Sequence, residues 1–161
     1  MPNSRPWWSQ PALLAAVIVI FAATLRLMNT EWDQNHHFHP DERAVVNAVQ
    51  RVTLPSFASF TAFKSTINNL NPEWFNYGSL PIYLTGITSA IIGMVDPNAR
   101  NYDGIILQGR RMTAVIGALT VLLLIVLGTL LYDQRVGLLA GFLLAACALH
   151  IQNSRFLAVD V

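Results

Sequence analysis

The feature that most constrains this chain is a run without a charged residue from Met112 to Tyr132. A helix of about 21 residues, rising 1.5 Å per residue, crosses a hydrocarbon core of roughly 30 Å. Because lipid cannot hydrogen-bond to exposed backbone groups, a spanning segment must be helical or belong to a closed barrel. The sequence therefore predicts a transmembrane helix over 112–132.

The composition agrees with a membrane protein. The 161 residues are 53% hydrophobic and only 12% charged, about half the charged fraction of a soluble domain, and the mean hydropathy is +0.44. The net charge is +1 and the Lys and Arg residues are scattered. The sequence therefore lacks the cluster of basic residues that is typical of nucleic-acid-binding proteins. We expect membrane lipids, and not nucleic acid, around this chain. The single cysteine excludes an intrachain disulfide.

A second transmembrane helix is expected over 7–28. Its start carries Trp7 and Trp8, typical of a membrane interface, and Arg5 precedes it as a cytoplasmic anchor. This pattern places the N-terminus in the cytoplasm. A cleaved signal peptide is the rival interpretation, disfavoured by Arg26 and by the lack of a small-x-small cleavage site.

A third transmembrane helix is expected over 136–158, after a turn at 133–135. Gly137 and Gly141 would let a neighbouring helix approach closely. The three helices predict an all-α integral membrane fold in a single membrane domain over 1–161.

The long stretch 29–111 then lies outside the membrane. Pro40 suits the first position of a helix near 40–52, and it places Asp41 and Glu42 in the opening turn, where the helix dipole favours negative charge. Apolar residues recur on one face of this helix, which predicts an amphipathic helix on the membrane surface.

The remainder of the outer stretch is less regular. Residues 53–76 show no sustained period and contain several Pro and Asn residues, so we expect a loop. The apolar segment 80–95 is too short and polar to span, and it suits a surface-lying or re-entrant helix. If that segment does not cross, Asp41 and Asp160 lie on the same outer face.

The stretch from His36 to Glu42 holds three of the four histidines and two adjacent carboxylates. His36, His37 and His39 could bind a divalent metal ion, but their spacing is not a recognised ligand signature. The carboxylates could also be plain helix-start residues. Adjacent helical side chains point about 100° apart, so at most one of them faces a given substrate atom.

Five short motifs together resemble the N-terminal part of a known enzyme class. They are His39–Glu42, Asn76–Leu84, Gly109–Arg111, Tyr132–Ala140 and His150–Phe156, the last followed by Asp160. Their order and spacing resemble the GT-C-fold, phospholipid-carrier-dependent glycosyltransferases of the protein-mannosyltransferase-like, family 39 type.

This resemblance implies transfer of a sugar from a polyprenyl-phosphate carrier to an unidentified acceptor on the outer face of a membrane, which we expect to be a prokaryotic cell membrane. The acidic residue at the catalytic centre corresponds to Asp41, with Glu42 beside it. Asp160 corresponds to a second acidic residue that helps to bind acceptor or metal. Enzymes of this fold contain many more spans, so we expect 1–161 to be an incomplete fragment, inactive by itself.

The residue types fit this chemistry. An outer-face carboxylate can act as the base for an acceptor hydroxyl, and the leaving phosphate needs cationic stabilisation. Arg110 is the first candidate for the phosphate and Arg155 the second, although both could simply reach from helix ends to the interface. Tyr77 and His39, which belong to the motifs, are further substrate-binding candidates.

Two other functions remain open. The chain could be a small non-enzymatic assembly subunit of a membrane complex. It could also be a transporter fragment, because Arg155 and Asp160 near the end of a span could mark an ion or substrate path.

Overall fold

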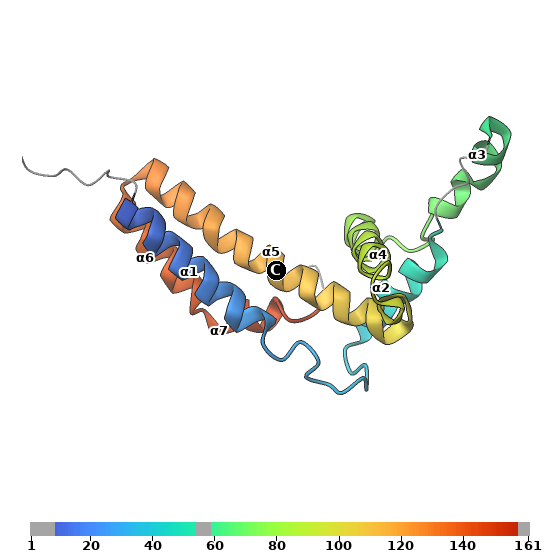
Figure 1. Ribbon diagram of the computed structural model, residues 1–161, viewed down its shortest axis with the longest axis horizontal. Coiled ribbons are helices and arrows are strands. Elements are labelled where there is room, and N and C mark those ends of the chain that lie inside the picture. The colour runs from blue at the N-terminus through green and yellow to red at the C-terminus, as the bar shows by residue number, and fades with distance from the viewer. Residues whose placement is uncertain (1–8, 54–58, 158–161) are drawn as a thin grey trace, which may run out of the picture. The chain divides into compact units, whose positions relative to one another are not determined.

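The computed structural model describes residues 9–53 and 59–157, and every regular element in those ranges is a helix (Figure 1). The expected all-α class is therefore confirmed. The helices are α1 (Ser9–Leu27), α2 (Pro40–Arg51), α3 (Phe60–Thr66), α4 (Leu80–Ile92), α5 (Tyr102–Leu131), α6 (Gln134–Ala145) and α7 (Ala148–Asn153), with 3-10 turns η1 (Ile67–Leu70) and η2 (Pro97–Arg100).

The chain divides into two compact units. The described part of unit 1 is 9–30 and 113–155, and that of unit 2 is 31–53, 59–112 and 156–157. Helix α5 contributes to both units and is one unbroken helix of 30 residues (Figure 1).

Two helices of the described residues, α1 and α5, are long and apolar enough to span a membrane. Large apolar side chains stay exposed along both of them, as expected for surfaces that face lipid. Helix α6 is apolar but has only 12 residues, fewer than the roughly 20 that a crossing needs. The structure thus shows two candidate spans, and a third is not confirmed.

The segment expected to form the third span is broken. Helix α6 ends at Ala145, Cys147 adopts an extended conformation, and α7 starts one residue later. The guanidinium of Arg26 donates hydrogen bonds to the carbonyl oxygens of Leu144 (3.1 Å) and Ala145 (3.3 Å). A side chain inserted into the backbone ladder is a recognised cause of helix breaks. One continuous helix over 136–158 was therefore a wrong prediction.

Helices α5 and α6 approach closely at glycines, as the sequence predicted. A Cβ atom on Gly137 would collide with Thr129 and the Ile125 carbonyl oxygen of α5, and one on Gly141 would collide with the Ile125 side chain. Helix α1 packs beside α6 (Figure 1). The core of unit 1 thus combines all three helices; its buried members are Ala22, Val121, Ile125 and Ala145.

Helix α2 begins at Pro40, as predicted, and its apolar face packs inside unit 2. The buried residues of α2 contact apolar residues of α4, of the start of α5 and of the segment after α7; together these are Val45, Val46, Ala48, Val49, Ile82, Ile105, Ile106 and Leu157. The face that we expected to contact lipid is buried within the protein instead.

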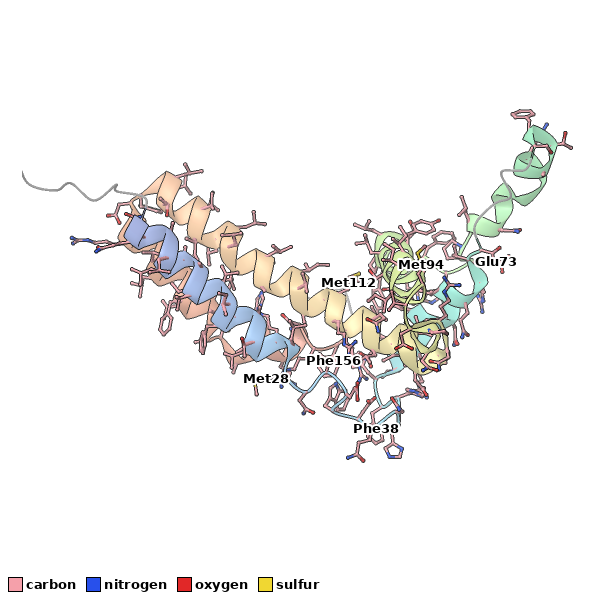
Figure 2. All side chains as sticks on the ribbon, in the orientation of Figure 1. Met28, Phe38, Glu73, Met94, Met112 and Phe156 are labelled. Atoms are coloured by element: carbon pink, nitrogen blue, oxygen red, sulfur yellow. The ribbon has the colours of Figure 1, made fainter. Side chains whose placement is uncertain are left out.

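Helix α4 buries two polar residues together with Ile82 and leaves other apolar residues exposed. Ile82, Thr85 and Ser89 are buried, whereas Leu84, Ile87 and Ile91 are exposed. Met94, which follows the helix and is labelled in Figure 2, is 77% exposed. A surface-lying helix would place the exposed apolar side chains of this 13-residue helix in the lipid interface, and that location stays a prediction.

Part of the expected loop is helical. Residues 60–70 form α3 and η1, so the prediction of a loop throughout 53–76 was wrong there. A helix of seven residues covers only two turns, which is too short to produce a recognisable period.

We predict that Gly137→Val destabilises unit 1, because the added atoms collide with the α5 backbone and force the helices apart. Overpacking of this kind lowers the free energy of unfolding by about 1–3 kcal/mol. The measurement is thermal unfolding of the chain in detergent micelles, followed by circular dichroism. Leu139→Val, on the exposed face of α6, is the matched control and should change stability by less than about 0.5 kcal/mol.

Candidate functional site

The centre of unit 2 is a buried arginine held by two carboxylates. Arg110 on α5 is 2% exposed. It donates hydrogen bonds from Nε and Nη2 to Glu42 (2.8 and 2.6 Å) and from Nη1 and Nη2 to Asp33 (2.9 and 2.7 Å). Both pairs are bidentate, the geometry in which a guanidinium binds a carboxylate most strongly. We call Asp33, Glu42 and Arg110 the triad.

Further contacts hold the triad from other segments of unit 2. The backbone N–H of Leu157 donates a hydrogen bond of 2.8 Å to Glu42 Oε1. The Arg110 guanidinium lies over the Trp32 ring, 4.9 Å from its centroid, which is a favourable cation–π distance. Glu42 thereby ties α2 both to α5 and to the segment after α7.

Asp33 also shapes the loop that follows α1. Its Oδ2 atom accepts a hydrogen bond of 3.1 Å from the backbone N–H of His37. Gln34, Asn35 and His37 all have positive φ angles, a conformation that is uncommon for residues other than glycine, although Asn and His adopt it more readily than most. The hydrogen bonds from Arg110 lower the pKa of Asp33 to about 2, outweighing burial, which acts in the opposite direction. Asp33 is therefore ionised at neutral pH.

Asp41 differs sharply from its neighbour. Its side chain is partly exposed, and its carboxylate has no hydrogen bond or ion pair with any residue that the structure describes. Glu42, one position further along the same helical turn, is fully buried and has both oxygens occupied. Asp41 is thus the carboxylate that a ligand can reach.

Two other expected site residues also lie in unit 2. His39 precedes α2, and its ring packs 4.8 Å from that of Phe156, which is labelled in Figure 2. Its Nδ1 atom is buried without a hydrogen-bond partner among the described residues. Tyr77 is exposed and lies edge-on to Trp74, with 5.4 Å between the ring centroids.

The remaining expected site residues are not in the described part of unit 2. Arg155 belongs to unit 1 and donates a hydrogen bond of 2.6 Å to the carbonyl oxygen of Leu25. Asp160 lies outside the described residues. The structure thus joins Glu42 with Arg110 and leaves Asp41 free beside them.

The three histidines of this stretch contact different partners. His36 stacks on Phe38, His37 Nε2 lies 2.8 Å from Asp103 Oδ1, and His39 packs on Phe156. Within the described ranges, no three His, Cys, Asp or Glu side chains are grouped as metal ligands. The described donor set therefore does not fit a divalent ion, and Asp160, the suggested metal ligand, lies beyond it.

Sequence reasoning missed Asp33 completely. It lies in a polar stretch with no period or motif of its own. Only a physical argument could have indicated Asp33. A buried arginine needs enough hydrogen-bond acceptors to offset the loss of its hydration. One glutamate cannot accept from all five N–H donors of an arginine, so a second acceptor is required.

We predict that Arg110→Gln destabilises the chain strongly, because it leaves two buried carboxylates facing each other without a cation. Removing one partner of a buried ion pair lowers the free energy of unfolding by about 3–5 kcal/mol. Arg111→Gln is the matched control, since Arg111 is half exposed and lies 3.8 Å from Glu31. Equal melting temperatures for the two variants in detergent would contradict the structural role of Arg110.

The lowered pKa of Asp33 predicts a pH dependence of stability. Its contribution of about 2 kcal/mol is fully present above the unfolded pKa of about 3.9 and is lost as pH falls toward 2. Unfolding of the wild-type chain between pH 5 and pH 2 measures this slope. Asp33→Asn should flatten it, and an unchanged slope would show that the ionised form of Asp33 does not stabilise the fold.

Comparison of the chain with models of known protein families, with curated proteins and with solved structures found no match in any of the three.

Proposed function

We propose that this chain supplies the N-terminal part of a membrane glycosyltransferase, which transfers a sugar from a polyprenyl-phosphate carrier to an acceptor on the outer membrane face. The order of the five sequence motifs supports this proposal. The two candidate spans α1 and α5 and the outward apolar side of α4 support its location in a membrane.

The observation that carries the proposal is the difference in environment between the carboxylates of Asp41 and Glu42. Transfer to a hydroxyl requires a group that accepts the proton as the acceptor oxygen attacks the sugar. Asp41 is partly exposed and has no described partner, so its carboxylate is available as that base. It also projects from the first turn of a helix whose position is fixed by its neighbour, which gives the base a defined location.

Glu42 then acts as a positioning residue and not as a second catalytic group. Both of its oxygens accept hydrogen bonds from Arg110, and one also accepts from Leu157. A substrate could reach Glu42 only by breaking these bonds.

Arg110 is poorly placed to bind the carrier phosphate. Arg110 is buried and neutralised by two carboxylates, so a carrier phosphate would have to displace one of them. Arg155 belongs to unit 1, is partly exposed and donates a hydrogen bond from Nη2 to the carbonyl oxygen of Leu25. Arg155 stays the second candidate for the phosphate.

The test uses the natural protein that contains this chain, in membrane vesicles supplied with a panel of polyprenyl-phosphate sugars. We predict that Asp41→Asn lowers the rate of sugar transfer by about 10²–10⁴-fold, the usual contribution of a general base. Membrane insertion and melting temperature should stay unchanged. Glu73→Gln, an exposed carboxylate of the same unit (Figure 2), is the matched control and should keep full activity.

Glu42→Gln separates positioning from catalysis. It should lower the melting temperature together with the activity, whereas Asp41→Asn lowers the activity alone. Normal transfer by Asp41→Asn would remove Asp41 from the mechanism. A wild-type protein that transfers no sugar from any carrier in the panel would favour the assembly-subunit or transporter alternative.

A further inference from the structure

The loop between α1 and α2 displays an aromatic side chain to which the proposed reaction has so far given no role. Phe38, labelled in Figure 2, is 65% exposed. It lies three positions before Asp41, the carboxylate that a ligand can reach. A single exposed apolar side chain is common on protein surfaces. The significance of Phe38 therefore depends on how it is held and on what lies next to it.

Phe38 belongs to a series of planar groups that begins at the triad. The Arg110 guanidinium lies 4.9 Å from the centroid of the Trp32 ring, and the centroids of the Trp32 and Phe38 rings are 6.4 Å apart. The His36 ring stacks on Phe38, with 5.4 Å between the centroids and an interplanar angle of 28°. Favourable aromatic pairs have centroid distances of roughly 4.5–7 Å. Phe38 is thus supported by two neighbouring rings while much of its surface stays open to solvent.

The backbone that carries Phe38 is also held by bonds from outside the loop. Asp33, which is fixed by the triad, accepts a hydrogen bond of 3.1 Å from the backbone N–H of His37. The His37 ring is anchored to the start of α5, because its Nε2 atom lies 2.8 Å from Asp103 Oδ1. Both anchors are at the residue directly before Phe38. A side chain that is already fixed in place loses little conformational entropy when it binds a ligand.

The polar residues of the same loop indicate the kind of ligand. Gln34, Asn35 and His36 lie within four positions of Phe38, are exposed, and offer hydrogen-bond donors and acceptors. Inserting this loop into hydrocarbon would be unfavourable, because these groups would lose their hydrogen bonds to water. A pyranose ring matches both kinds of surface, since its C–H groups form an apolar patch and its hydroxyl groups form hydrogen bonds. The negative face of an aromatic ring attracts such C–H groups.

We propose that Phe38 binds the ring of a pyranose sugar in the site that contains Asp41. This inference rests on the proposed function, in which the ring belongs either to the carrier-linked donor or to a glycan acceptor. Phe38 is then a substrate-binding residue, which raises the affinity for the sugar and takes no part in proton transfer.

The first test is the binding of free sugars to the natural protein that contains this chain, measured by saturation-transfer NMR. The protein is kept in dodecylphosphocholine, a detergent without a sugar headgroup that would compete. The probes are methyl β-D-glucopyranoside and methyl α-D-mannopyranoside, and mannitol is the open-chain match without a ring. We predict saturable binding of at least one pyranoside, with the strongest signals from ring C–H protons, and none of mannitol.

Three variants assign this binding to the Phe38 ring. Phe38→Ala should weaken pyranoside binding about tenfold, the effect of losing one aromatic contact. Phe38→Trp keeps an aromatic face and should bind within about threefold of the wild type. Phe60→Ala removes another exposed phenylalanine of unit 2, which is 81% exposed, and should bind like the wild type. Circular dichroism checks that all three variants fold.

The second test is sugar transfer, which identifies the source of the ring. Phe38→Ala should raise the KM for the carrier-linked sugar when the ring belongs to the donor, and the KM for the acceptor when it belongs to the acceptor. In both cases kcat should change little, because the contact is equally strong in the ground state and the transition state. A purely structural role of Phe38 would lower the melting temperature and leave both KM values unchanged.

Three results would overturn the proposal: neither pyranoside binds, mannitol binds as tightly as the pyranosides, or a folded Phe38→Ala variant binds like the wild type. Failure of the proposed function gives a different result. In that case pyranosides bind to the wild type and not to Phe38→Ala, yet no sugar is transferred from any carrier.

Discussion

The described part of unit 2 depends on the burial of one positive charge. A guanidinium withdrawn from water is strongly destabilising unless its donors are matched by well-placed acceptors. Arg110 obtains four such bonds from two segments far apart in sequence, the loop after α1 and the start of α2. Satisfying Arg110 therefore fixes the positions of the loop, of α2 and, through Leu157, of the segment after α7.

Unit 1 buries an arginine as well, but the acceptors of its hydrogen bonds are different. Arg26 is fully buried and donates to three backbone carbonyl oxygens and to His150 Nδ1. An arginine can only donate hydrogen bonds, so His150 Nδ1 must accept and its ring proton resides on Nε2. Two of these carbonyl groups belong to Leu144 and Ala145, the last residues of α6. The helix break and the buried charge are thus one feature, in which peptide dipoles take the place of carboxylates.

Most local structure could be predicted from local sequence. The uncharged run of α5, the proline that starts α2 and the small residues between α5 and α6 each act over a few neighbouring positions. Apart from the short helix α3, the failures involve partners distant in the chain. The α6 break has no Gly or Pro of its own, and Arg26, whose side chain donates to the carbonyl groups at the break, lies more than a hundred positions earlier. Likewise, the different environments of Asp41 and Glu42 follow from Arg110, which no inspection of the Pro40 region could show.

Helix α5 is longer than a membrane crossing requires. Its 30 residues correspond to about 45 Å, roughly 15 Å more than a hydrocarbon core. The surplus of about ten residues is the charged start of the helix, which carries Arg110 and hence the bonds to Asp33 and Glu42. One helix therefore supplies both a segment that is long and apolar enough to span a membrane and the cation that organises unit 2.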